Sequence, residues 1–312
     1  MFVIDDGSTD GTKEVVAGYS EKFRRRGLSF HYVYQENQGQ STAINCGLKL
    51  ISGDYLIWPD ADDWYAESDA LEIMAASLAD TTDDVGCCHC LSSYIDERNL
   101  EITHKNPARP TAEADLFEDC LFDANGFVWG AGNYMLKTHV GLNETNGRSI
   151  FTAKDAAQNS QLLLPVLYEK KCVIINKYLF NILQRVASHS RKKLAFEKEF
   201  SKYNAYHNAV INTLDSMEML AIKRERYKRE IDTKYNDLKL RICFAHGKTK
   251  DYRNLYKQMA GMESSPCKKR KRLYYLSYVP CGWIVHKTMG AYYKRATNVL
   301  RRCIGKFRKF FA

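Results

Sequence analysis

Short apolar runs alternate with amphipathic segments over the first 65 residues. Residues 2–4 and 28–34 are rich in β-branched and aromatic side chains and predict two buried strands. The apolar residues between them recur at helical spacing and are Val15, Val16, Tyr19 and Phe23. Residues 41–51 predict a second helix, and residues 55–58 predict a third strand. The order β-α-β-α-β implies an α/β fold with a largely parallel sheet.

Acidic clusters follow the first and the third of these strands. They read VIDDGSTDGT at 3–12 and DYLIWPDADDW at 54–64. Ligands of open α/β sheets bind at the carboxyl ends of strands, and Asp60 and Asp62 are two apart, so an extended chain places both on one face. Carboxylates are ligands for Mg²⁺ or Mn²⁺, whose remaining positions phosphate oxygens can fill. A solvated Asp-rich turn is the alternative for an isolated DxD motif.

Other phosphate-binding and calcium-binding motifs do not match the chain. An EF-hand that starts at Asp6 would need a bidentate Glu at its twelfth position, where the chain has Ala17. The second acidic cluster has Tyr65 where an EF-hand needs Gly. The sequence also lacks a P-loop motif and a GxGxxG segment after a strand, so neither of these nucleotide-binding sites is predicted.

Together, VIDDGSTDGT and ENQGQSTAINCGLKLISGDYLIWPDADDWY at 36–65 resemble the inverting family 2 glycosyltransferases of GT-A fold. The resemblance covers about residues 2–190 and implies a mixed sheet flanked by helices. It implies that Asp6, with Asp5 beside it, contacts the nucleotide of a nucleotide-sugar donor. It also implies that Asp60 and Asp62 hold Mn²⁺ or Mg²⁺ and the ribose-diphosphate, with Asp62 as the direct metal ligand.

The catalytic base is where the chain departs from this family. FVWGAGNYMLKTHVGL at 127–142 resembles the family's acceptor-side segment, and Gln158 and Asn159 stand where many members carry Glu-Asp. An amide cannot take the proton of an acceptor hydroxyl at neutral pH. Asp155 lies about one helical turn before Asn159 and is the predicted base. A helix N-cap is the alternative role for Asp155.

Two further departures concern the nucleotide side. Ile44 stands where the family often has Arg, which removes one charge for a phosphate. Family members also begin with a further strand, turn and helix, whereas here Met1 directly precedes the DDGS strand. We therefore expect a truncated reading frame or a misassigned start, with strand edges left unpaired and with low stability or activity of this chain alone.

Charge divides the chain near Ser190. Residues 1–190 contain 16 Lys and Arg against 27 Asp and Glu, whereas residues 191–312 contain 30 against 10. This shift predicts a GT-A domain over 1–190 and a basic helical region over 191–312. An apolar stripe at helical spacing runs from Phe196 to Met217 and supports the helical prediction.

The terminal segment predicts an amphipathic helix at about 284–311. After Glu263 the chain has 13 Lys and Arg and no acidic residue, beginning with KKRKR at 268–272. Aromatic residues flanked by cations suit the surface of an anionic bilayer, and no apolar stretch is long enough to span one. Docking on the acidic half of the chain is the alternative, and RNA binding is the least favoured partner.

The ten cysteines are scattered and no signal peptide precedes them, which predicts the reducing cytoplasm. Cys87, Cys88, His89 and Cys90 could suggest a metal cluster, but no second pair follows at zinc spacing, so buried thiols in a strand at 84–91 are favoured. His189 could lie near a donor diphosphate, and a solvated loop is its alternative.

These observations predict an enzyme. It would transfer a sugar, from a UDP-linked donor by family resemblance, to a hydroxyl of a glycan or lipid-linked acceptor in surface polysaccharide synthesis at the cytoplasmic face of the membrane. The transfer would be metal-dependent and inverting. A non-catalytic relic that acts as a scaffold through its basic tail is the alternative.

Overall fold

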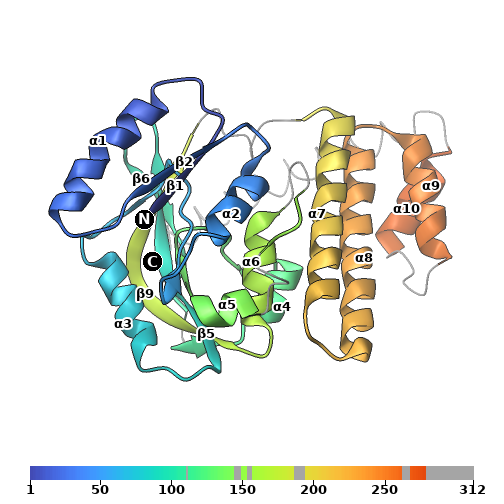
Figure 1. Cartoon of the computed structure of the whole chain (residues 1–312). Coiled ribbons are helices and arrows are strands. Elements are labelled where there is room, and N and C mark those ends of the chain that lie inside the picture. Colours follow the sequence, from blue (N-terminus) through green and yellow to red (C-terminus); the bar gives the residue numbers. More distant parts are fainter. Residues whose placement is uncertain (110–111, 144–148, 153–156, 186–193, 262–267, 279–312) are drawn as a thin grey trace, which may run out of the picture. The chain divides into compact units, whose positions relative to one another are not determined.

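The computed structural model describes residues 1–109, 112–143, 149–152, 157–185, 194–261 and 268–278 (Figure 1). Asp155, His189 and the predicted helix at 284–311 lie outside these residues. The chain divides into two compact units, residues 1–232 and 233–312. The division falls later than the charge shift near Ser190, and the domain boundary at 190 stays a prediction.

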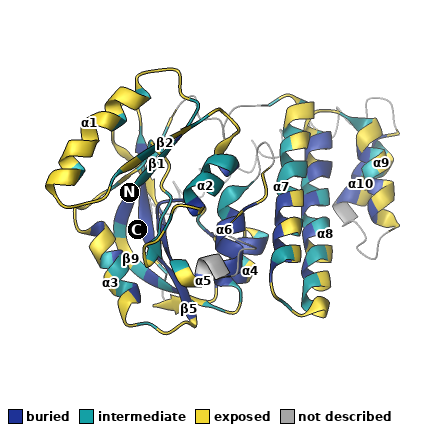
Figure 2. Cartoon of the chain, viewed as in Figure 1, coloured by how far each residue is buried: buried dark blue, intermediate teal, exposed yellow. Residues whose placement is uncertain are grey.

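The first two strands form a small sheet of their own. β1 (Phe2–Asp6) pairs in parallel with β2 (His31–Gln35), and the two are joined by α1 (Thr12–Arg25). The helix α2 (Gln40–Leu48) follows. The predicted elements are confirmed, yet no residue of α1 is buried, as its colouring in Figure 2 shows. A two-stranded sheet offers too little apolar surface to cover the stripe of this helix.

The main sheet is mixed. Only β5 and β9 pair in parallel, and every other strand pair in this sheet is antiparallel. The expectation of a largely parallel sheet is wrong, because the third predicted strand pairs with a later, antiparallel strand instead of with β1 or β2. The strands on the main path, in hydrogen-bonded order, are β3 (Tyr55–Leu56), β8 (Tyr134–Lys137), β5 (Val85–Asp96), β9 (Lys171–Gln184) and β4 (Trp64–Tyr65). Two short strands pair at the side, β6 (Ile102–Lys105) with β5 and β7 (Glu113–Ala114) with β9.

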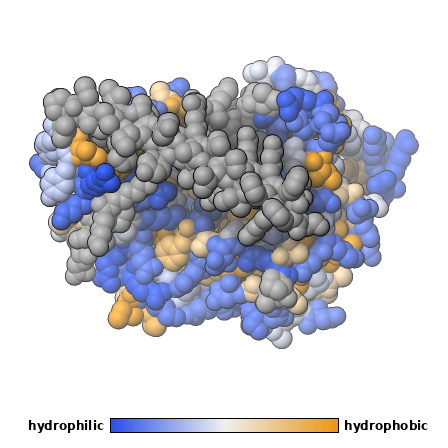
Figure 3. Space-filling view, turned by 180° about the vertical axis from the view of Figure 1, so that it is seen from behind, coloured by the Kyte–Doolittle hydropathy of each residue, from blue (hydrophilic) through white to orange (hydrophobic). Residues whose placement is uncertain are grey.

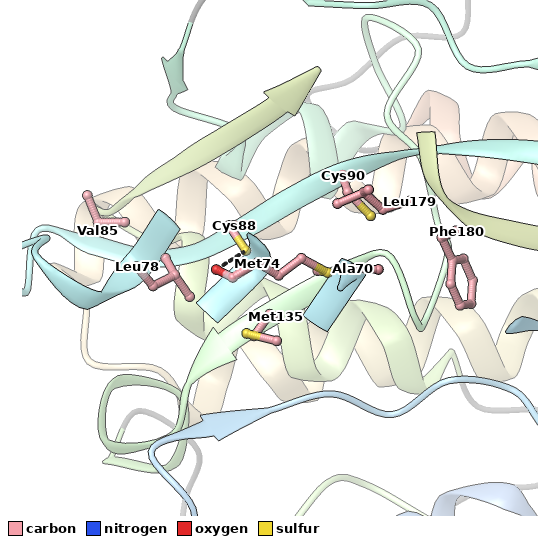
Figure 4. Close-up of a cluster of buried hydrophobic side chains, with 9 residues drawn as sticks. All are labelled: Ala70, Met74, Leu78, Val85, Cys88, Cys90, Met135, Leu179 and Phe180. Carbon is pink, nitrogen blue, oxygen red and sulfur yellow. Dashed lines mark hydrogen bonds between the residues drawn. The ribbon is translucent and has the colours of Figure 1, made fainter. Parts of the chain in front are cut away.

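Helices flank this sheet (Figure 1). They are α3 (Ala70–Ala79) on one side and α4 (Phe117–Phe122), α5 (Thr138–Asn143) and α6 (Gln158–Leu167) on the other. Figure 4 shows the core between α3 and the sheet, where Met74 lies among Cys88, Leu78 and Met135. The Cys88 thiol contacts the Met74 carbonyl oxygen at 3.5 Å. The prediction of buried thiols is confirmed, since Cys87, Cys88 and Cys90 are fully buried.

Long helices make up the rest of the described chain, as the sequence predicts. They are α7 (Phe196–Ser216), α8 (Ala221–Ala245), α9 (Thr249–Ala260) and α10 (Lys268–Leu276). Within the second unit, the Arg270 guanidinium is ion-paired with Asp237, and the Tyr252 hydroxyl donates to the Arg270 carbonyl at 3.2 Å. One arginine of the KKRKR run is therefore buried inside this unit.

None of the described helices is both long enough and apolar enough to cross a bilayer. Figure 3 shows the face opposite to that of Figure 1. Hydrophilic residues cover most of the coloured surface there, and the hydrophobic residues gather in small separate groups. Scattered apolar groups of this kind are normal on a protein surface.

Candidate functional site

The buried Asp5 at the end of β1 connects the two strands of the small sheet. Its carboxylate accepts hydrogen bonds from the Tyr32 hydroxyl at 2.5 Å and from the Ser8 amide at 2.8 Å. The bond from Tyr32, followed by that from Ser8, lowers the pKa of Asp5, and the same contact raises the pKa of Tyr32 to about 12. Asp5 is thus an ionised anchor between β1 and β2.

Asp6 holds the loop that leads into α2. Its carboxylate accepts hydrogen bonds from the Gln35 amide side chain at 2.7 Å and from the backbone amides of Gln38 at 2.9 Å and Gly39 at 2.8 Å. Gly7 follows with a φ of +81°, and a Cβ there would lie 2.7 Å from the Asn37 backbone nitrogen. Only glycine fits this close approach, which explains the Asp-Asp-Gly sequence.

The second acidic cluster lies beyond β3 and contains three carboxylates. Asp60 accepts a hydrogen bond from the Gln40 side chain at 3.1 Å, and Asp62 pairs with the Arg185 guanidinium at 3.0 Å. Asp63 accepts from the Leu183 backbone amide at 2.9 Å, which fixes the acidic turn to the end of β9. The first turn of α2 and the end of β9 therefore both reach the DxD turn.

Electrostatic repulsion acts within this cluster. Enclosure by neighbouring protein atoms, and then the charge of Asp62, raises the pKa of Asp60, although its side chain still reaches solvent. Burial raises the pKa of Asp63 to about 6, and the charges of Asp62 and Asp60 add to this increase. A bound cation would relieve the repulsion, so the cluster has the electrostatics of a cation site.

Two amide side chains at the start of α6 complete the arrangement. The Gln158 side chain donates a hydrogen bond to the Gln40 side chain, which itself contacts Asp60. Asn159 accepts from the Trp58 indole at 2.9 Å and donates to the Trp129 carbonyl oxygen at 3.3 Å. Both ends of the Asn159 amide are engaged, as expected of a positioning residue.

An apolar cluster packs next to the site. Its buried members are Ile150, Leu48 of α2 and Leu162 of α6, and Ile44 and Trp58 pack against them. Ile44, which stands where an arginine is frequent in the family, belongs to this cluster and contributes to packing. The Asn45 side chain also exchanges two hydrogen bonds with the Ile150 backbone, at 2.7 and 2.8 Å.

The predicted site residues thus meet in part. Asp60 and Asp62 share one turn, and Asp6 holds the loop that carries Gln40 to Asp60. Asp155 lies outside the described residues. Two contacts of the acidic turn, Gln40 and Arg185, were not predicted from the sequence. The position of Gln40 at the start of a helix after a strand is a signal that could have identified it, whereas nothing in the sequence links Arg185 to Asp62.

The donor set suits a hard divalent cation that also binds phosphate. Among the described residues, no three His, Cys, Asp or Glu side chains converge into a complete metal site. Asp60 and Asp62 present carboxylate oxygens, which is the small protein ligand set that Mg²⁺ or Mn²⁺ uses when substrate phosphates supply further oxygens. The residues present therefore fit such an ion together with a diphosphate.

Comparison with known sequences gives a consistent result. Residues 1–136 match the protein-family model described as Glycosyl transferase family 2. A cholesterol galactosyltransferase of Borreliella burgdorferi is 25% identical over 257 residues, which cover 78% of this chain and 65% of that protein. Glycosyltransferase GlyA of Streptococcus pneumoniae serotype 4 is 37% identical over 85 residues, 27% of this chain and 12% of that protein. The chain spans less than two thirds of the length of these two relatives.

A solved structure shares the fold. The crystal structure of residues 1–349 of S. aureus TarS in complex with UDP-GlcNAc aligns with a TM-score of 0.58 and 14% sequence identity, covering 87% of this chain and 74% of that chain. At this identity the likeness concerns the fold alone. The expectation of a GT-A mixed sheet flanked by helices, followed by a mainly helical region, is confirmed.

Proposed function

Because the chain belongs to the family 2 glycosyltransferases through its N-terminal domain, we propose that it transfers a sugar from a nucleotide-diphosphate donor to an acceptor hydroxyl with inversion. One observation carries this proposal. Asp6 fixes the loop that delivers Gln40 to Asp60, so the DDGS end of β1 and the DxD turn after β3 are joined through two hydrogen-bonded contacts. A nucleotide and its diphosphate need these two ends to be held together.

The donor side is formed by the acidic turn and Arg185. A divalent cation held by Asp60 and Asp62 would neutralise charge that develops on the leaving diphosphate. The Arg185 guanidinium pairs with Asp62, so it becomes available to the diphosphate when Asp62 binds an ion. TarS was crystallised with UDP-GlcNAc, which supports a UDP-sugar as the first donor to test.

The acceptor side needs a base for the hydroxyl proton. Gln158 and Asn159 cannot serve, since an amide does not accept a proton at neutral pH. We keep Asp155 as the proposed base, and its exchange for Asn tests the role through loss of transfer with donor binding retained.

The proposed acceptor and cellular site are those that the family resemblance implies. A glycan or a lipid-linked glycan fits a cytoplasmic enzyme of surface polysaccharide synthesis, and the basic terminal region supports peripheral binding to an anionic membrane. The Borreliella relative is named for a lipid acceptor, cholesterol. The second candidate function is a non-catalytic scaffold, which the amides at 158 and 159 favour.

Thermal unfolding with Mn²⁺ and UDP tests the proposal directly. We expect the two ligands together to raise the melting temperature more than either alone, because the diphosphate completes the coordination of the ion. The change Asp62→Ala should abolish this joint shift and ion-dependent hydrolysis of the donor, with the unliganded melting temperature nearly unchanged.

Asp69→Ala is the matched control, since Asp69 is an exposed aspartate that makes no side-chain cap to α3. It should keep the full joint shift. A wild-type chain without a joint shift for UDP or GDP would favour the scaffold, and a shift that persists in Asp62→Ala would remove this residue from the ion site.

A further inference from the structure

A tryptophan in the loop before β8 is hydrogen-bonded through both its indole and its backbone, and it remains partly exposed. Trp129 is 36% exposed, although Phe127 before it and Gly130 after it are buried. Its indole N–H donates to the Asp123 carboxylate at 2.9 Å, and its carbonyl oxygen accepts from Asn159 at 3.3 Å. Orientation of the ring is therefore fixed in advance of any ligand.

Several contacts hold the loop around Trp129 in place. Phe127 packs edge-on against the Trp129 ring with centroids 4.8 Å apart, and the Tyr134 hydroxyl donates to the Val128 carbonyl at 3.1 Å. Further along, the Tyr65 hydroxyl donates to the Gly132 carbonyl at 2.9 Å. A large aromatic side chain on such a fixed loop would usually turn its ring into the core, as Phe127 does.

Unusual backbone conformations support the position of Asp123. Asp123, Asn125 and Gly126 all have positive φ, at 55°, 49° and 69°. Asp and Asn adopt this region more readily than other non-glycine residues, and Asp123 does so as the left-handed C-cap that ends α4. Here the conformation brings the Asp123 carboxylate back to the indole N–H six residues later.

The loop that carries this ring is tied to the proposed reaction centre through its backbone. Asn159 joins the Trp129 backbone to the Trp58 indole, and Trp58 precedes Asp60 by two residues. The same loop touches the acidic turn directly, because a Cβ on Gly132 would lie 2.9 Å from Pro59. The loop that Asp6 holds reaches Asp60 from another direction in the chain, through Gln40 of α2.

We propose that the exposed ring of Trp129 is the platform on which a sugar ring of the acceptor stacks, so that the acceptor is a glycan. One face of a pyranose presents C–H groups, which pack on an aromatic face, while its hydroxyls remain free for polar contacts. The Asp123 carboxylate fixes the indole edge and leaves the ring face for the sugar. This inference rests on the proposed function, since it identifies the acceptor of that same site.

Saturation-transfer NMR measures the contact without requiring turnover. The probes are the methyl glycosides of glucose, galactose and N-acetylglucosamine, added at millimolar concentration to the full chain with UDP and the diamagnetic ion Mg²⁺. Dispersed farnesol serves as a lipid alcohol. We expect at least one glycoside to receive saturation, strongest at the C–H protons of one ring face. Trp129→Phe should retain most of this signal and Trp129→Ala should lower it at least fivefold.

Two more variants secure the interpretation. Asp123→Ala leaves the ring in place but frees its edge, so the signal should fall by an intermediate factor even if Trp129→Ala folds poorly. Tyr19→Ala removes an exposed aromatic side chain on α1 and should change nothing. Equal signals in wild type and Trp129→Ala, no signal from any glycoside, or saturation of farnesol alone would each overturn the platform.

The experiment separates this inference from the proposed function. A glycoside signal that depends on Trp129 without any joint thermal shift by Mn²⁺ and UDP would leave a sugar-binding site and disprove donor use. A normal joint shift without a glycoside signal would support donor binding and disprove the sugar platform at Trp129.

Discussion

Adjacent carboxylates in this chain have different partners, and single residues decide their roles. Asp5 faces Tyr32 inside the small sheet, whereas Asp6 binds the backbone of the loop before α2. In the second cluster, Asp60 contacts a neutral amide, but Asp62 contacts a guanidinium. The charge available to a ligand therefore depends on Arg185 as much as on the aspartates.

Replacement of Arg185 by Gln should change metal and nucleotide binding in opposite directions. Without the guanidinium, Asp62 is free and the turn is more negative, so Mn²⁺ alone should bind more tightly, by about threefold for an exposed ion pair. UDP with Mn²⁺ should bind more weakly, because a cation beside the diphosphate is lost. Calorimetric titration measures both affinities.

Arg24→Gln provides the control, since Arg24 also pairs with a carboxylate, that of Glu21, but within α1. It should leave both affinities unchanged. Equal weakening of Mn²⁺ and of UDP in Arg185→Gln would show that the arginine acts on the structure of the turn.

His89 makes the stability of the fold depend on pH. Burial, and then the positive charge of Arg109, lowers the pKa of His89 to about 3. The histidine is therefore neutral when folded but charges near its ordinary pKa of about 6.5 when unfolded. The contribution of neutral His89 to the free energy of unfolding is fully present above pH 6.5. It is lost as the pH falls toward 3, by about 1.4 kcal/mol per pH unit.

Urea unfolding at pH 7, 6, 5 and 4 measures this slope. His89→Gln should be less stable at pH 7, because the His89 ring contacts the Asn133 side-chain amide at 3.3 Å and packs at a tilt against the Tyr134 ring. The variant should lose less stability on acidification. His104→Gln replaces an exposed histidine and should keep the wild-type slope. Identical slopes in wild type and His89→Gln would refute the assignment.

At the scale of elements, β5 and α6 approach each other closely at Gly86. The register between β5 and β9 shifts at Gly86, between Val85 and Cys87. Val85 and Cys88 consequently both face α3 despite their odd spacing, and Gly86 faces the backbone of α6. A bulge of this kind re-aims the side chains that follow it.

Gly86→Ala should destabilise the sheet unit. The new Cβ would lie 2.4 Å from the Val166 carbonyl oxygen, so β5 and α6 must separate. Overpacking against backbone costs about 1–3 kcal/mol or more. Denaturant unfolding monitored by circular dichroism gives the change in the free energy of unfolding.

Gly18→Ala is the opposite case in the same unit. Gly18 lies on the exposed side of α1 with nothing near a Cβ, so the alanine should stabilise by up to about 1 kcal/mol. Destabilisation by Gly18→Ala would mean that α1 has a partner which its exposed face does not reveal. An unchanged Gly86→Ala variant would mean that β5 can move away from α6 at no cost.

At the scale of the whole molecule, the uneven charge serves more than one purpose. The basic run at 268–272 suggests a membrane surface from sequence, but the second unit uses Arg270 internally. Its guanidinium also donates to Asp237 at 2.9 Å, and Asp237 pairs with Arg241 at 2.8 Å. Arg272, in contrast, is exposed.

Two changes in this run should therefore have separate effects. Arg270→Ala should lower the stability of the second unit by about 2 kcal/mol, the range of a hydrogen bond to a charged group. Arg272→Ala should leave stability unchanged but weaken flotation with vesicles containing phosphatidylglycerol, by up to about fivefold for one surface cation. Neutral vesicles and high salt are the controls. Equal flotation with neutral and with phosphatidylglycerol vesicles would contradict the proposed electrostatic binding to the membrane.

The sequence by itself determined the order of the elements, the two acidic clusters and the helical second half. Apolar periodicity is a local property, so β1, α1, β2 and α7 could be placed within a few residues. The family resemblance supplied the mixed sheet, which periodicity alone had predicted as largely parallel. Strand direction depends on which later segment returns beside β3, and local spacing does not contain that information.

Only the tertiary structure decided which side chains meet. Asp62 and Arg185 are 123 positions apart by residue number, and Gln40 meets both Asp60 and Gln158 from another element. In the sequence Trp129 is one residue of an aromatic segment. Only the structure shows that Asp123 fixes its indole and that Asn159 binds its backbone. Such contacts arise from packing between distant elements, and pattern along the chain cannot specify them.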